Sequence, residues 1–169
     1  MNKTIVCEVL LHSYKDLEKK CEFMEERAVK FALQSMNKDA YTCAETLLKL
    51  NNEKITLCNI KVVIDDAMNA ISENDELRAF HCDGLSYKQI VQAEQISLRT
   101  FFRRIARQKE MLFEAIQERY SDECLFELVR GSRWIFNRYC EAVRRAESER
   151  KGKNKETNDQ KPKTAQIGK

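Results

Sequence analysis

Residues that break helices are almost missing from this sequence. Of its 169 residues only four are Gly and one is Pro, and that proline, Pro162, stands close to the end. Turns between strands usually depend on Gly, Pro, Asn or Asp, whereas the abundant Leu, Ala, Glu, Lys and Arg favour helices. We therefore expect an all-α protein, a helical bundle of about six helices.

The apolar runs indicate the compartment of the protein, and the spacing of the cysteines indicates whether it binds a metal. No apolar run approaches the roughly 18–20 residues of a membrane-spanning helix, and the N-terminus lacks the pattern of a secretory signal. We expect a cytoplasmic protein with no membrane partner. The seven cysteines form no Cys-x-x-Cys pair. Structural zinc sites need close ligand pairs, so we expect reduced packing residues, no metal and no cofactor.

The sequence offers no recognisable catalytic constellation. Its two histidines, His12 and His81, have no neighbours that suggest a general base or a ligand set. There is no Gly-rich phosphate loop, and the acidic residues are interspersed with basic ones as on helix surfaces. We expect the protein not to be an enzyme.

An apolar seam runs along the segment 3–35. Two rows of residues spaced by seven form the a and d positions of about four heptads. The rows are Cys7, Tyr14, Cys21 and Ala28, and Leu10, Leu17, Met24 and Phe31. The segment is either a long amphipathic helix that packs on its own bundle or a coiled coil that joins two copies in a homodimer.

The chain divides into four segments by pattern and composition. They are N-terminal amphipathic helices over 1–65, a helix-turn-helix domain over 66–120, a C-terminal helix over 121–147 and a basic tail over 148–169.

Several breaks are expected inside and between these segments. Asn51–Asn52 should separate a helix over 39–50 from one over 54–72, and Gly131–Ser132 should interrupt the C-terminal helix. The tail is rich in Lys, Asn, Gln and Thr without an apolar period. It cannot bury enough apolar surface to offset its ordering entropy, so we expect it to be disordered.

A helix-turn-helix is predicted over 86–109. Ser86 with Gln89 three residues later is a capping-box pattern for a first helix. The turn falls near Glu94–Gln95, and Ser97 would cap a second helix that extends to about Tyr120. Ile90 and Ile105 should pack together between the two helices.

The second helix of this motif is strongly basic at its start. Between Ser97 and Lys109 there is no acidic residue, and residues 81–109 hold six Lys and Arg against two Asp and Glu. A short helix, a turn and a basic helix present side chains to the DNA major groove, which makes double-stranded DNA the leading partner. The alternative is a pair of core helices with a solvated basic face.

The same residues carry a family resemblance. The stretches are Leu77-Arg78-Ala79-Phe80, Asp83 to Ile90, and Ile96-Ser97-Leu98-Arg99-Thr100-Phe101 followed by Ile105. They resemble the fourth region of bacterial sigma factors and the related regulators of phages and mobile elements, over roughly residues 66–111. Glu94 and Gln95 stand where that family has an apolar residue and glycine, which would place Gln95 in a left-handed conformation.

The resemblance implies transcription regulation through the second helix. By position, Arg99, Phe102 and Arg103 would face bases, while Lys88, Thr100, Arg104 and Arg107 would lie nearer phosphates. It also implies RNA polymerase as a further candidate partner. A competing hypothesis is a protein-interaction module of the same fold that has lost sequence-specific DNA readout.

Overall fold

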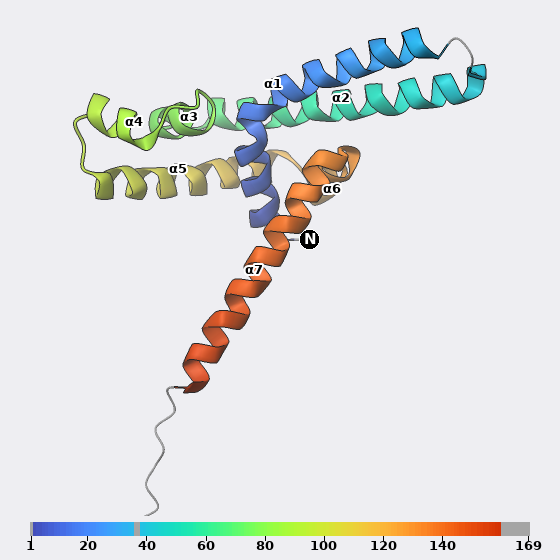
Figure 1. Cartoon of the computed structure of the whole chain (residues 1–169). Coiled ribbons are helices and arrows are strands. Elements are labelled where there is room, and N and C mark those ends of the chain that lie inside the picture. Colours follow the sequence, from blue (N-terminus) through green and yellow to red (C-terminus); the bar gives the residue numbers. More distant parts are fainter. Residues whose placement is uncertain (1, 36–37, 160–169) are drawn as a thin grey trace, which may run out of the picture.

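The computed structural model describes residues 2–35 and 38–159, with side chains as far as residue 149. Over these residues the protein is all-α, as the scarcity of Gly and Pro predicts (Figure 1). The helices are α1 (Lys3–Gln34), α2 (Ala40–Ala70), α3 (Asp75–His81), α4 (Tyr87–Ala93), α5 (Leu98–Arg119), α6 (Asp122–Gly131) and α7 (Arg133–Asp159). In this part of the chain no helix is long and apolar enough to span a membrane.

Helices α1 and α2 form a long antiparallel hairpin that projects from the body of the molecule (Figure 1). Four pairs of polar side chains join the two helices at regular intervals. The helices are antiparallel, so the residue number rises along α1 by as much as it falls along α2. Along the hairpin the pairs are Tyr14 with Asp65, Glu18 with Lys61, Cys21 with Cys58, and Glu25 with Lys54.

The heptad seam of α1 belongs to the chain's own core. Leu10, Leu17 and Met24 are buried in the hydrophobic cluster, and Tyr14 and Cys21 pack against it. Helix α1 packs chiefly against α2 and α7 of the same chain. The seam is therefore that of an amphipathic helix that packs on its own bundle. A homodimer that used this seam would have to expose the core.

Helix α1 changes direction within its first half (Figure 1). Ser13 Oγ donates to the Val9 carbonyl at 2.7 Å, a backbone contact that often bends helices. From α7, Arg138 Nη1 donates to the His12 carbonyl at 3.3 Å and to Ser13 Oγ at 3.2 Å, and its Nη2 pairs with Asp16 at 2.8 Å. Arg138 thus fastens α7 to α1 at the backbone groups around the bend.

The predicted interruption at Gly131–Ser132 is confirmed, since α6 ends at Gly131 and α7 begins at Arg133. A Cβ on Gly131 would lie 2.6 Å from Thr56 Oγ1 and 2.9 Å from Thr56 Cγ2. Glycine therefore lets α6 approach α2 closely. Ser132 Oγ donates to Glu53 at 3.1 Å and accepts from the Ile135 backbone N–H at 3.5 Å, which caps the start of α7.

Two predicted boundaries are wrong. α2 runs through Asn51–Asn52 without a break. Both asparagines are exposed, and their small propensity cost is offset by the burial of Leu50 and Leu57 on either side.

The expected disorder from residue 148 is also wrong for the residues described, because α7 continues to Asp159. An existing α-helix extends at little cost per residue, which allows α7 to continue over this stretch. The rest of the predicted tail, 160–169, lies outside the described residues.

Candidate nucleic-acid interface

The first helix of the motif begins as the sequence predicts. Ser86 Oγ accepts from the Gln89 backbone N–H at 3.4 Å, and Gln89 Oε1 accepts from the Ser86 backbone N–H at 2.9 Å. This reciprocal capping box satisfies N–H groups that have no partner within the helix.

The turn after α4 is a Schellman motif built without glycine. The Ile96 N–H donates to the Val91 carbonyl at 3.2 Å, which is the six-to-one bond of this motif, and the Glu94 N–H forms the last ordinary helical bond, to the Ile90 carbonyl at 2.9 Å. Gln95 takes the left-handed position between them with φ of 51°. Glycine normally occupies this position because a side chain there is strained. The left-handed conformation expected at Gln95 is therefore found.

The second helix begins at a serine cap. Ser97 Oγ accepts from the Thr100 backbone N–H at 3.1 Å and lies 2.8 Å from Thr100 Oγ1. Thr100 is half-buried and its hydroxyl is already engaged in the cap. The helix is held from within by Phe101 and Ile105, which are buried in the same cluster as Ile90 of α4.

The outward face of α5 combines cations with exposed apolar side chains. Phe102 is 52% exposed, its ring lies 6.3 Å from that of Tyr87, and Leu98 lies one turn before it. Positions three and four residues apart share one face of a helix. That face holds Arg99, Phe102, Arg103 and Ala106, all exposed, and Lys88 is exposed on α4.

Arg104, the next residue, has a different environment. Its Nη1 donates to Glu76 Oε1 of α3 at 2.6 Å, and Gln108 Nε2 donates to the other carboxylate oxygen at 2.5 Å. Gln108 Oε1 in turn accepts from the Leu77 backbone N–H at 2.9 Å. Glu76 and Gln108 are buried, so these bonds satisfy polar groups that would otherwise be unpaired.

The hydrogen bonds to Glu76 also decide its protonation. Burial alone would raise the pKa of this carboxyl, but the hydrogen bonds from Arg104 and Gln108 bring it below its usual value. The side chain is therefore a buried carboxylate at neutral pH, and Arg104 is its only ion-pair partner within the described residues.

Two further cations of α5 face other parts of the protein. Arg107 Nη2 lies 3.8 Å from Glu73 Oε2, and both side chains are largely exposed. Together with Arg103 and Arg104, Arg107 lines a groove of about 650 Å³ that the acidic segment Ser72–Glu76 also lines. Lys109 is partly buried, which lowers its pKa, with Glu8 of α1 acting in the opposite direction.

The structure thus separates the predicted site residues into two groups. Lys88, Arg99, Phe102 and Arg103 are exposed, and none of these three cations forms an ion pair within the described part of the chain. Thr100, Arg104 and Arg107 already have protein partners. Sequence reasoning missed Glu73, Glu76 and Gln108, because no local pattern links α3 to residues about thirty positions later.

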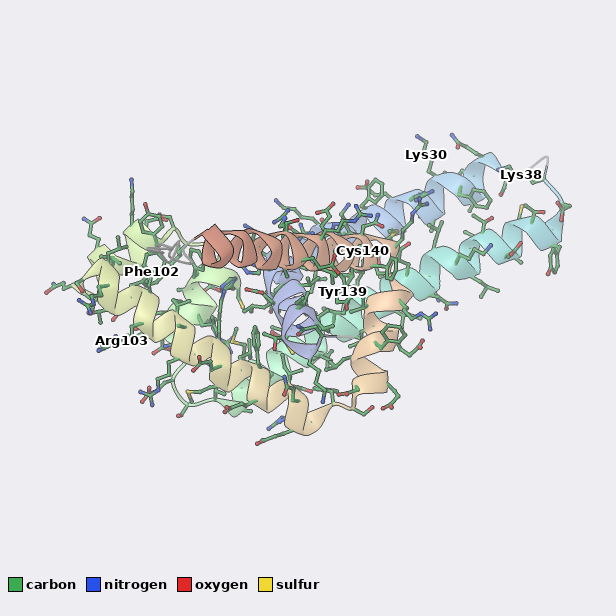
Figure 2. The ribbon with its side chains drawn as sticks, turned by 90° about the horizontal axis from the view of Figure 1, so that it is seen from below. Lys30, Lys38, Phe102, Arg103, Tyr139 and Cys140 are labelled. Atoms are coloured by element: carbon green, nitrogen blue, oxygen red, sulfur yellow. The ribbon has the colours of Figure 1, made fainter. Side chains whose placement is uncertain are left out.

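This end of the molecule is also remote from the α1–α2 hairpin tip. Figure 2 shows Phe102 and Arg103 at one end and Lys30 and Lys38 at the other. The chain matches no protein-family model, no curated protein and no solved structure.

Proposed function

We propose that the protein is a DNA-binding transcriptional regulator that docks the start of α5 in the major groove of double-stranded DNA. The observation that carries this proposal is the exposed face of Arg99 and Arg103 at the N-terminal end of a helix held by the turn and caps described above. In helix-turn-helix proteins it is the first residues of the second helix that reach base edges.

The chemistry of the exposed side chains suits this role. Arg99 and Arg103 can each form two hydrogen bonds to a guanine, and the Phe102 ring can contact a thymine methyl group. Lys88 projects from α4, the helix that crosses the backbone in such complexes, so its ammonium group suits a phosphate.

The residues that already have protein partners position α5 for DNA binding or lie beside its DNA-binding face. Arg104 holds α5 against α3 through Glu76, and Thr100 fixes the first turn of α5 through Ser97. Arg107 is held only by an exposed pair at 3.8 Å. Such a pair contributes little, so Arg107 can turn to a phosphate at small cost.

The experiment that tests this function is a selection of bound sequences from random duplex DNA, followed by retention measurements across a salt series. A regulator of this kind enriches one sequence and keeps a preference for it at moderate salt. Enrichment of no sequence, with no retention at low salt, would exclude the proposal.

The second candidate function is a protein-interaction module, and a specific observation favours it. Four apolar side chains around the motif are exposed: Leu85, Tyr87, Leu98 and Phe102. Grouped exposed apolar residues often mark protein contacts. In this second proposal, the exposed apolar side chains would contact RNA polymerase. The salt series separates the two candidates, since the module alone retains no DNA.

A further inference from the structure

Two cysteines meet across the α1–α2 hairpin. Cys21 Sγ of α1 lies 3.8 Å from Cys58 Sγ of α2, in the rung between Glu18–Lys61 and Glu25–Lys54. Cys58 is exposed and Cys21 is half-buried. Within the described residues no other pair of cysteine sulfurs is in contact.

We propose that Cys21 and Cys58 form a dithiol modification site that reacts with low-molecular-weight disulfides and closes into an intrachain disulfide. The sulfurs need to approach by less than about 2 Å to reach bonding distance, which side-chain rotation can supply. The proposal is independent of DNA binding, because the hairpin and the exposed face of α5 lie in different parts of the molecule (Figure 2).

The environment of the two sulfurs assigns them different roles. Burial raises the pKa of the Cys21 thiol to about 11, and its hydrogen bond with Cys58 acts in the same direction. Cys21 therefore stays protonated at neutral pH. Cys58 is exposed to solvent, whereas Cys21 is half-buried, so a small disulfide in solution reaches the Cys58 sulfur more easily. Cys58 is thus the sulfur that reacts first.

The reaction balances with a small disulfide as the oxidant. The Cys58 thiolate attacks one sulfur of the small disulfide, whose S–S bond breaks, and the first small thiolate leaves and takes up a proton. Cys21 then loses its proton to solvent, and its sulfur attacks the Cys58 sulfur and expels the second small thiolate. Two cysteine thiols are oxidised, and one small disulfide is reduced to two thiols.

Closing this bond would change the hairpin without changing its fold. The two cysteines already sit in register on packed helices, so helix content should stay the same. The cross-link closes the chain between residues 21 and 58, which contains the hairpin tip, and it restricts the unfolded state. The oxidised protein should therefore melt at a higher temperature than the reduced protein.

The test uses the full-length reduced protein, incubated under native conditions with oxidised glutathione. The remaining thiols are then alkylated after denaturation, and the mass and the unreduced digest are measured. We expect a loss of two hydrogen masses, five alkylated cysteines, one cross-linked peptide pair that joins Cys21 to Cys58, and a raised melting temperature.

Single variants separate this site from general cysteine reactivity. Cys21→Ser should trap glutathione on Cys58, whereas Cys58→Ser should leave Cys21 unmodified. Cys124 is exposed and forms no contact with another cysteine sulfur within the described residues, so Cys124→Ser is the matched control and should form the cross-link like the wild type. Wild-type protein that accumulates glutathione on Cys58 without closing, that links Cys21 or Cys58 to another cysteine, or that leaves both thiols unmodified would overturn the proposal.

Discussion

Arg104 Nη1 donates a hydrogen bond to Glu76 Oε1 at 2.6 Å, which joins α5 to the buried carboxylate of α3. The preceding residue, Arg103, is exposed and forms no ion pair within the described residues. Two adjacent arginines in one basic run therefore have different tasks. One holds the second helix of the motif in place, and the other is available to a ligand.

This difference predicts that substituting the two arginines changes the stability by different amounts. Arg104→Ala should lower the free energy of unfolding by about 1–3 kcal/mol, because it leaves Glu76 buried with Gln108 as its remaining side-chain partner. Arg103→Ala should change it by about 0.5 kcal/mol or less. Urea denaturation followed by circular dichroism measures both. Equal effects of the two substitutions would contradict the assignment.

The turn before α5 gives a prediction in the stabilising direction. Gln95→Gly should raise the free energy of unfolding by about 0.5–1 kcal/mol, because glycine takes the left-handed conformation at φ of 51° without strain. Gln95→Ala is the control, since alanine carries the same Cβ and should give no such gain. A loss of stability in Gln95→Gly would mean that this turn is not left-handed.

The close approach of α6 to α2 can be tested with a double-mutant cycle. Gly131→Ala should destabilise the protein by about 1–3 kcal/mol, because the new Cβ would lie 2.6 Å from Thr56 Oγ1. In a Thr56→Ala background the same change should cost much less, since both close atoms are gone. The prediction fails if Gly131→Ala has the same cost in both backgrounds.

Buried His81 predicts a dependence of stability on pH. The side chain is 5% exposed and its Nε2 has no hydrogen-bond partner in the described structure. Burial lowers its pKa to about 3, and the positive charges of Lys109, of His12 when it is protonated and of Lys15 act in the same direction. The unfolded chain, with an ordinary histidine pKa, therefore binds the proton first as pH falls.

The sign follows from this order of protonation. The contribution of neutral His81 is complete above about pH 6.5 and is lost progressively as pH falls toward about 3, at no more than about 1.4 kcal/mol per pH unit. Denaturation at several pH values measures the slope. His81→Phe should flatten it, with a residual slope from His12, whose pKa burial also lowers. An unchanged slope in His81→Phe would exclude His81 as the source.

The local features of the motif could be predicted from sequence because neighbours in the chain determine them. The capping box of Ser86 and Gln89, the Ser97 cap and the left-handed Gln95 each depend on a few adjacent residues, and all three are found. The all-α class follows in the same way from composition. Whether the exposed face binds DNA stays a prediction.

Features that depend on distant packing could not be predicted in the same way. The Glu76–Arg104 pair joins residues from two helices, and only the fold shows that Arg104 is engaged. The break expected at Asn51–Asn52 is absent, because burial of Leu50 and Leu57 outweighs the weak propensity of asparagine. Likewise, the composition from residue 148 onward predicts disorder, but α7 continues to Asp159.

The central claim, that the exposed start of α5 reads DNA, is tested most directly by the affinity of variants for one selected duplex and one unrelated duplex over a salt series. Arg99→Ala and Arg103→Ala should each weaken binding to the selected duplex by about 1–3 kcal/mol and relax base preference. Lys88→Ala should weaken binding to both duplexes alike and reduce the salt slope by about 1. If all three substitutions act equally on every duplex, or if none changes the affinity, α5 does not read DNA sequence.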